Sequence, residues 1–293
     1  MENTPPPVFT TFDIKSALKS GVEQLEKTSE SATLDAELLL AKCLNKNRTY
    51  LHTWPEKKLT QQQLNCFNSC IEKRSQDYPV AYLLGHQPFW TLDLTVTPEV
   101  LIPRPETELL VETALEKISE ITQPKILDMG TGTGAIALAI ASERPDATVF
   151  ASDLFESVLD IARKNAIKHH LNRSVTFIQS NWFSTITERE FDLIVSNPPY
   201  IEPHDTHLSG SIRHEPHQAL VAKNHGMKDL EIIIHNSPGF LKANGWLILE
   251  HGYNQGQACQ KLLQENHFGN IMTKKDLNAV DRITLASIKI KNK

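Results

Sequence analysis

The sequence FDLIVSNPPY spans residues 191–200 and sets the architecture around it. Its first five residues form a largely apolar run, typical of a buried parallel strand. Two prolines cannot continue a hydrogen-bonded ladder, so the strand should end at Asn197. Asn197 is therefore expected at the carboxyl end of a strand, where open α/β sheets bind their ligands.

The residues that follow this strand present polar groups in fixed directions. Prolines restrict φ, so the carbonyl of Pro198 is held rigidly between Asn197 and Pro199. The Asn197 side-chain oxygen and that carbonyl make two aimed acceptors, with the aromatic face of Tyr200 beside them. A planar NH2 group, such as a carboxamide or the exocyclic amine of a base, suits this set. The alternative is a strand-ending turn in which Asn197 only caps the chain locally.

The composition is that of an ordinary globular protein. Its 293 residues are enough for two domains. Of these residues, 40% are hydrophobic and 22% are charged, which is ordinary for a globular protein. No apolar run approaches the roughly 20 residues of a membrane helix, and the first seven residues do not form a signal peptide. We therefore expect a cytoplasmic protein with no membrane contact. A monomer is expected as well, although these observations do not themselves give the oligomeric state.

The cysteines and the net charge narrow the function further. Cys66 and Cys70 lie one helical turn apart, and we expect a buried apolar pair without disulfides rather than a metal or redox site. With 30 basic and 35 acidic side chains, the net charge is −5. Broad nucleic-acid binding needs a basic surface, so direct nucleic-acid partners are not expected.

Residues 1–88 read as a small helical domain. One apolar stripe recurs at spacings of three and four along residues 14–25. Thr33 is expected to cap a second helix, and Thr60 with Gln63 forms a capping box before a third. The domain carries ten basic and ten acidic side chains and no catalytic constellation. It either docks the substrate or acts as a lid that only stabilises the larger domain.

Residues 89–108 change character and predict a linker. The segment 89–96 is rich in β-formers with partial alternation, which indicates a β-hairpin. Pro103 and Pro105 then hold Arg104 in a defined direction. Arg104 and Glu106 either line a pocket or form a structural ion pair.

Residues 109–293 alternate between strand and helix patterns. Five strands alternating with helices predict a doubly wound, mostly parallel sheet, and two final strands without a helix between them predict an antiparallel hairpin at one edge. The expected fold is thus α/β and Rossmann-like, with seven strands. The strands are expected at residues 125–129, 148–153, 175–178, 191–195, 246–250, 270–274 and 282–290, and helices at residues 108–119, 135–142, 158–169, 227–241 and 255–266.

A glycine loop follows the first strand and opens a helix. Its five residues are Gly130, Thr131, Gly132, Thr133 and Gly134. The third glycine comes one residue earlier than in the dinucleotide fingerprint, and no Lys-Ser or Lys-Thr follows, which excludes a P-loop.

Two carboxylates indicate what the loop holds. Asp128 precedes the loop, where it suits a cationic amino group better than a phosphate. Asp153 ends the second strand, 23 residues after Gly130, and can accept from both ribose hydroxyls; its lesser alternative is a helix cap. A nucleoside with a cationic amino-acid tail fits, which predicts S-adenosylmethionine as cofactor. Asn181 and Trp182 could read and cover its adenine, unless Trp182 is a core residue.

Four histidines in one polar loop, at positions 204, 207, 214 and 217, invite a metal interpretation. Nothing nearby completes a tetrahedral ligand set, so no metal site is expected, and loop solvation or partner contact accounts for them better. Arg213 and Glu215 of the same loop are expected to order it over the substrate.

Several of these motifs together resemble one enzyme family. LIPRPETE (101–108), LDMGTGTG (127–134), NPPY (197–200), IRHEP (212–216) and LEHG (249–252) are similar to the bacterial PrmC/HemK methyltransferases. The proline-arginine segment separates this family from other Asn-Pro-Pro-Tyr enzymes. The resemblance covers nearly the whole chain, weakest in residues 1–30 and in the last few.

The resemblance implies a class I methyltransferase domain with an N-terminal helical domain and a hairpin linker. It implies transfer of a methyl group to the side-chain N5 of the glutamine in the Gly-Gly-Gln motif of class I peptide chain release factors, which modulates translation termination. By motif, residues 130–134, Asp153, Trp182 and Asn197 contact the cofactor, and Asn197, Pro198, Pro199 and Tyr200 hold the glutamine. Asn181 departs from the family, which has aspartate there; its amide oxygen can still accept from the adenine amine.

The nucleophile that this resemblance implies, a side-chain amide, is weak. An amide lone pair is delocalised, so we expect Asn197 and the Pro198 carbonyl to accept hydrogen bonds from both N–H groups and to hold the nitrogen in line with the methyl group. Tyr200 is expected to pack on the carboxamide.

Two other functions are considered. An adenine-N6 nucleic-acid methyltransferase can use the same tetrapeptide on a flipped base, but would need a basic groove. A non-catalytic binding protein with the same fold is the other rival.

Overall fold

The computed structural model describes residues 12–288 and divides the chain into two units. The first unit is Met1–Gly85 and the second is His86–Lys293. The last two residues of the strand expected at 282–290 lie outside the described residues.

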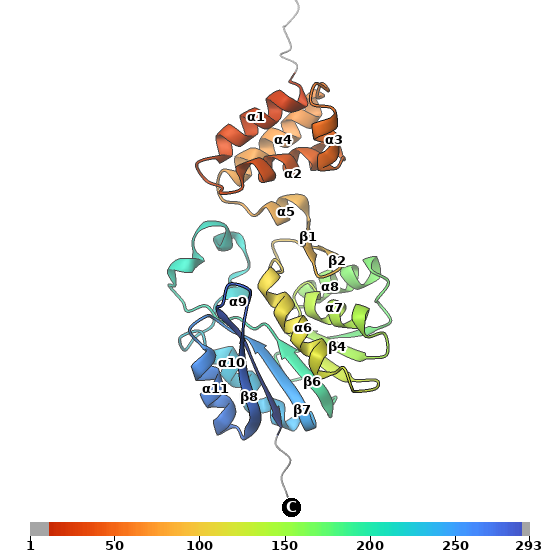
Figure 1. Ribbon diagram of the computed structural model, residues 1–293, viewed down its shortest axis with the longest axis vertical. Coiled ribbons are helices and arrows are strands. Elements are labelled where there is room, and N and C mark those ends of the chain that lie inside the picture. The colour runs from red at the N-terminus through yellow and green to blue at the C-terminus, as the bar shows by residue number, and fades with distance from the viewer. Residues whose placement is uncertain (1–11, 289–293) are drawn as a thin grey trace, which may run out of the picture. The chain divides into compact units, whose positions relative to one another are not determined.

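The first unit is helical, as expected (Figure 1). Its helices are α1 (Ile14–Leu25), α2 (Ala32–Leu44), α3 (Arg48–Thr53), α4 (Gln61–Arg74) and α5 (Val80–Leu84). Helices α1, α2 and α4 contact one another in pairs around a core that includes Ile14, Leu39 and Phe67. Each helix thus buries one apolar stripe, which is how short amphipathic helices become stable.

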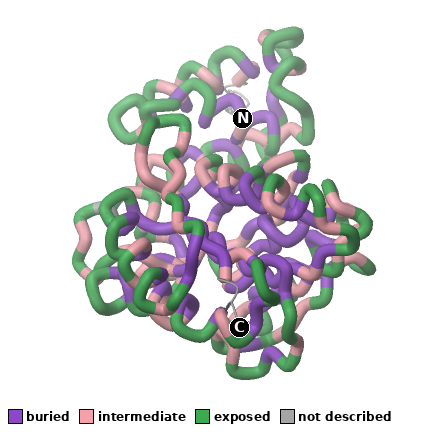
Figure 2. Tube along the Cα trace, turned by 60° about the horizontal axis from the view of Figure 1, so that its bottom comes forward, coloured by how far each residue is buried: buried purple, intermediate pink, exposed green. Residues whose placement is uncertain are grey.

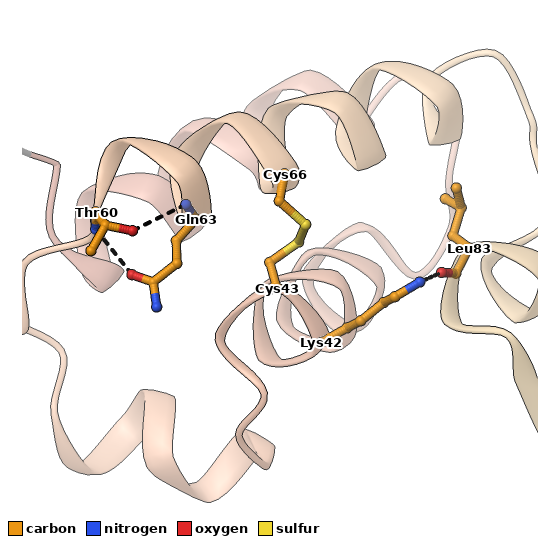
Figure 3. The surroundings of a disulfide bond; sticks show 6 residues. All are labelled: Lys42, Cys43, Thr60, Gln63, Cys66 and Leu83. Atoms are coloured by element: carbon orange, nitrogen blue, oxygen red, sulfur yellow. Dashed lines mark hydrogen bonds between the residues drawn. A yellow bond between two sulfur atoms is a disulfide. The ribbon is translucent and has the colours of Figure 1, made fainter.

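Side chains satisfy backbone or polar groups at the starts of two of these helices. The Thr60 hydroxyl accepts from Gln63 N at 3.2 Å, and Gln63 Oε1 accepts from Thr60 N at 3.0 Å, so the capping box is confirmed (Figure 3). The cap expected at Thr33 is wrong, because α2 begins at Ala32. The buried Asp35 accepts instead from the Ser31 hydroxyl at 3.0 Å and from Arg74 Nε at 2.7 Å, which joins the start of α2 to the end of α4.

The cysteines differ from the expectation. A disulfide joins Cys43 on α2 to Cys66 on α4, across 23 residues of sequence (Figure 3). Cys66 is exposed, and the free thiol of Cys70 lies within 4.8 Å of both bonded sulfurs. The expected buried Cys66–Cys70 pair is therefore wrong, because helix packing brings Cys43 of another helix against Cys66. Beside the disulfide, Lys42 of α2 donates to the Leu83 carbonyl of α5.

The second unit starts with the expected hairpin, three residues earlier than the sequence indicated. Strand β1 (His86–Phe89) pairs antiparallel with β2 (Leu92–Thr95), and Trp90 in the turn has a φ of 55°. The proline-arginine segment then leads into a 3-10 turn, η1 (Pro105–Thr107), and helix α6 (Glu108–Lys117).

The sheet has seven strands in the order β5-β4-β3-β6-β7-β9-β8, which confirms the fold class. Strands β3 to β7 are parallel, and β9 pairs antiparallel with both β7 and β8. Its strands are β3 (Lys125–Met129), β4 (Thr148–Asp153), β5 (Val175–Gln179), β6 (Phe191–Ser196), β7 (Leu241–Glu250), β8 (Phe268–Lys275) and β9 (Asp281–Ile288). The remaining elements are α7 (Ala135–Glu143), α8 (Glu156–Lys168), η2 (Thr206–Leu208), η3 (Gly210–His214), α9 (His217–Leu220), α10 (Lys228–Asn236), η4 (Ser237–Gly239) and α11 (Gly256–Glu265).

Helices cover both faces of this sheet, and the central strand β6 is buried at every residue (Figures 1 and 2). Successive side chains of strand β3 point to opposite faces of the sheet: Ile126 belongs to the core with α6, α7 and α8, whereas Leu127 belongs to the core with α10 and α11. Two apolar cores result, one on each face, which explains why these strands are apolar runs rather than alternating patterns.

One helix ends earlier than expected. The sequence predicted a helix over residues 227–241, but α10 ends at Asn236 and strand β7 already begins at Leu241. The run Ser237-Pro238-Gly239 forms η4 instead, because proline cannot donate the next helical hydrogen bond and restricts the residue before it. Among residues 12–288, no helix has both the length and the apolar character that crossing a bilayer requires.

We expect Cys43→Ser to lower the free energy of unfolding of the helical unit by about 3 kcal/mol under non-reducing conditions, because the disulfide no longer restricts the unfolded chain. Dithiothreitol should lower the unfolding midpoint of the unaltered protein and leave that of Cys43→Ser unchanged. Cys70→Ser, which removes the neighbouring free thiol, is the matched control and should keep the sensitivity to dithiothreitol. Four free thiols in the denatured, unreduced protein would contradict the pairing.

Candidate active site

A cavity lies at the carboxyl edge of the parallel sheet, where the chain order reverses between β3 and β6. This topological switch point is where open α/β sheets place their ligands. The segments after β3, β4, β5 and β6 all contribute to it. Its lining residues include Gly130, Gly132, Asp153, Asn181, Trp182, Asn197 and Pro199 from the sequence analysis, and Glu99, Leu154, Phe155, Gln218 and Asp229 beyond it.

The glycine loop turns sharply above β3. Gly130, Gly132 and Gly134 have φ values of 71°, 56° and 85°, a region that other residues rarely adopt. A Cβ atom at Gly132 would meet no atom within 4 Å, so the loop leaves open space on this side of the cavity. Thr131 and Thr133 are buried and do not line the cavity.

Asp128 supports the loop from below. Its Oδ2 accepts from the Thr131 hydroxyl at 2.6 Å and from Ala137 N at 3.2 Å, whereas Oδ1 is buried without a hydrogen-bond partner among the described residues. Burial raises its pKa to about 7, and the nearby Asp153 carboxylate adds to the rise. Asp128 does not line the cavity, so the carboxylate expected to face an amino group braces the loop instead.

Asp153 does face the cavity, from the end of β4. Its Oδ2 accepts from Gly132 N at 3.1 Å and its Oδ1 from Phe155 N at 3.2 Å. Burial raises its pKa, and these backbone donors partly offset that rise. Each oxygen keeps a second lone pair, so the carboxylate can accept further hydrogen bonds from a ligand.

Trp182 forms a wall of the cavity beside the glycine loop. Its Nε1 donates to Asp229 Oδ1 at 3.1 Å, and a Cβ built on Gly130 would lie 3.6 Å from its ring. The half-buried ring also packs against the core on the α10 side of the sheet. Its place is therefore compatible with both expected alternatives, a core residue and a cover for adenine, because the ring contacts the core and also borders the cavity.

The NPPY segment leaves the sheet directly after β6. Asn197 and Pro199 line the cavity, whereas the buried Pro198 and the partly buried Tyr200 do not. Asn197 Nδ2 donates to the Thr107 hydroxyl at 3.2 Å, and its Oδ1 has no hydrogen-bond partner among the described residues. None of the described hydrogen bonds uses the Pro198 carbonyl either. The segment thus keeps two oxygen acceptors available.

A buried carboxylate to which the sequence analysis assigned no role contacts this segment. Glu250, at the end of β7, is 1% exposed and accepts from the Thr107 hydroxyl at 2.8 Å and from the Tyr200 hydroxyl at 3.3 Å. Burial raises its pKa to about 7; the Arg282 guanidinium opposes this rise and Glu106 adds to it. A signal existed, because an acidic residue ends an apolar strand at the ligand-binding edge.

The proline-arginine segment is held by an ion pair of Arg104, but the partner is Glu215 and not Glu106, which the sequence analysis had considered together with it. Arg104 Nη2 donates to Glu215 Oε1, and Ile102 N donates to the other oxygen of Glu215 at 3.0 Å. Glu215 is buried, so the segment before α6 and the loop containing η3 are fixed to each other. Arg104 and Glu106 do not line the cavity.

Two domain families match the chain. Residues 16–85 match the family described as PrmC N-terminal domain, and residues 105–223 match the one described as methyltransferase small domain. Full-length relatives are similar over most of the chain. The release factor glutamine methyltransferase of Shewanella oneidensis is 46% identical over 93% of this chain and 95% of its own, and that of Pseudomonas aeruginosa is 49% identical over 88% and 93%.

Solved structures resemble the fold at much lower identity. The hMettl16 catalytic domain in complex with a MAT2A 3'UTR hairpin aligns with a TM-score of 0.56, at 17% identity over 69% of this chain and 77% of its own. A methyltransferase from Pyrococcus furiosus aligns with a TM-score of 0.50, at 15% identity over 68% and 90%. At such identities the likeness establishes the fold alone.

We expect Asp128→Asn to remove a pH dependence of stability. In the folded protein Asp128 keeps its proton up to about pH 7, whereas the unfolded chain releases it near pH 3.8. Between these values the native state holds more protons, so the free energy of unfolding falls as pH rises, by up to about 4 kcal/mol.

The measurement is urea unfolding of the ligand-free protein from pH 4.5 to 8. Asp128→Asn should lack this part of the slope, and the exposed Asp160→Asn on α8 is the matched control. Equal slopes for the protein and Asp128→Asn would contradict the assignment.

Proposed function

The chain belongs to the release factor glutamine methyltransferase family, and we propose that it methylates the side-chain N5 of the glutamine in the Gly-Gly-Gln motif of class I peptide chain release factors. The observation that carries this proposal is the pair of acceptors at the end of β6. The Asn197 Oδ1 atom and the Pro198 carbonyl match the two N–H groups of a carboxamide.

We propose S-adenosylmethionine as the methyl donor, because the cavity residues fit it. The side-chain-free surface at Gly132 permits close approach of a ligand, and the Asp153 carboxylate has lone pairs for two ribose hydroxyls. Trp182 supplies an aromatic wall, and Asn181 offers an amide to an adenine edge. When bound, this cofactor supplies a methyl group that is already a good electrophile.

The chain's own residues address the weak nucleophile. An amide nitrogen reacts poorly because its lone pair is delocalised into the carbonyl group. Asn197 and the Pro198 carbonyl hold the nitrogen in one position, and their dipoles stabilise the positive charge that develops on it. The proton then leaves through either acceptor or to water. Tyr200 packs on the carboxamide, with its hydroxyl fixed on Glu250.

We propose that the helical unit docks the release factor, that residues 86–108, which begin with the hairpin, are the linker, and that residues 109–293 carry the chemistry. In support, nearly all residues that line the cavity belong to the last segment, with Glu99, Val100 and Leu101 added from the linker. A release factor substrate implies a cytoplasmic reaction, and we propose a monomeric enzyme.

The direct test is mass spectrometry of a class I release factor after incubation with the protein and S-adenosylmethionine. We expect one added methyl group on the glutamine of the Gly-Gly-Gln motif and none on a factor with alanine there. DNA and RNA oligonucleotides serve as competing substrates. Methylation of adenine instead, or of no substrate, would reject the proposal.

We expect Asn197→Ala to reduce methyl transfer by about a hundredfold or more, because one of the two fixed acceptors is lost. The affinity for S-adenosylmethionine, measured by calorimetry, should change by less than about threefold. Equal losses of transfer and of cofactor affinity would contradict the substrate-holding role.

We expect Asp153→Ala to weaken S-adenosylmethionine binding by about 10-fold to 100-fold, since a carboxylate accepting from ribose hydroxyls contributes about 1.5–3 kcal/mol. Because the defect is in binding, the rate of methyl transfer by Asp153→Ala should approach that of the unaltered protein at saturating cofactor. Asp160→Ala, an exposed aspartate on α8, is the matched control and should bind normally. Unchanged affinity in Asp153→Ala would place the ribose elsewhere.

A further inference from the structure

The Asn197 carboxamide has two different ends, and only one serves the proposed reaction. Oδ1 can accept a hydrogen bond from a substrate NH2 group, whereas Nδ2 can only donate. The two ends have nearly the same shape, so packing alone does not decide which end faces the cavity. A hydrogen-bonding partner of fixed polarity has to decide it.

Thr107 and Glu250 supply that polarity. At pH 8, above its raised pKa, Glu250 is ionised and its carboxylate can only accept hydrogen bonds. Its Oε2 lies 2.8 Å from Thr107 Oγ1, so the single Thr107 hydroxyl hydrogen points to Glu250. The lone pairs of Thr107 Oγ1 are then left for a donor. Asn197 Nδ2 lies 3.2 Å from this oxygen and provides one.

The surroundings leave little freedom for another arrangement. Thr107 is 4% exposed and Glu250 is 1% exposed, so bulk water does not compete for these bonds. The second oxygen of Glu250 receives the Tyr200 hydroxyl at 3.3 Å. Thr107 itself belongs to η1, directly after the segment that Arg104 fixes to Glu215.

We propose that Thr107 and Glu250 are positioning residues that hold the Asn197 carboxamide with Oδ1 toward the cavity. This inference rests on the proposed function, in which that oxygen accepts from the substrate glutamine. Neither residue lines the cavity, so both act through Asn197. The chain of donors runs in one direction only, from the Asn197 amide through the Thr107 hydroxyl to the Glu250 carboxylate.

The experiment compares Thr107→Val, which removes the hydroxyl at nearly constant shape, with Thr107→Ser, which keeps it. At pH 8, we expect kcat for release factor methylation to fall about 10-fold to 100-fold in Thr107→Val and to stay within about threefold in Thr107→Ser. The Kd for S-adenosylmethionine should stay within about threefold in both. Glu250→Gln can present either amide end to Thr107, so we expect a smaller loss of kcat.

A matched control separates positioning from general stability. Thr113 is a fully buried threonine on α6 whose hydroxyl accepts from Lys274 Nζ at 3.3 Å, with no described contact to Asn197. Thr113→Val should reduce stability without changing kcat. If Thr107→Val keeps the full kcat while the unaltered protein methylates the release factor, the inference is overturned and the proposed function stands.

A second readout does not depend on activity. In the ligand-free protein, nuclear magnetic resonance should show the Asn197 side-chain NH2, assigned by its loss in Asn197→Ala, exchanging slowly with solvent. We expect exchange at least about tenfold faster in Thr107→Val and near the original rate in Thr107→Ser. Fast exchange in the unaltered protein would overturn the inference even if no methylation of a release factor were found.

Discussion

The pairing of β3 with β6 is the constraint on which the site depends. Its register places Met129 opposite Ser196, and the Ser196 hydroxyl donates to the Met129 carbonyl at 2.7 Å. The next residue of each strand, Gly130 and Asn197, therefore leaves the sheet at the same edge. Since a slip by one residue would turn every side chain of β6 to the other face, the two buried cores fix this register.

The same edge concentrates carboxylates under conditions that oppose their charge. Asp128, Asp153 and Glu250 all have raised pKa values because burial disfavours the ionised form. Hydrogen bonds from hydroxyl or backbone donors lower the pKa of each carboxyl and so partly offset the rise caused by burial. Clusters of perturbed acids are typical of functional sites, where a protein accepts a loss of stability for a fixed arrangement of polar groups.

Local patterns in the sequence predicted most of the strands and helices and part of the cavity lining. The strands, the glycine loop, Asp153 and Asn197 can each be recognised from the few residues that flank them in the sequence. Thr107 and Glu250 are 143 residues apart and Arg104 and Glu215 are 111 apart, so no local spacing could reveal these contacts. The cysteines illustrate the same limit. Cys66 and Cys70 share a helix face, yet the partner of Cys66 is Cys43, brought close by the packing of α2 against α4.

The apolar side chains at the cavity have a thermodynamic consequence. Leu154 and Phe155, directly after Asp153, are 48% and 38% exposed although both are large and hydrophobic. A ligand that covers them removes ordered water from nonpolar surface, so occupation of the cavity should lower the heat capacity of the system. Its enthalpy of binding would then become more favourable as temperature rises.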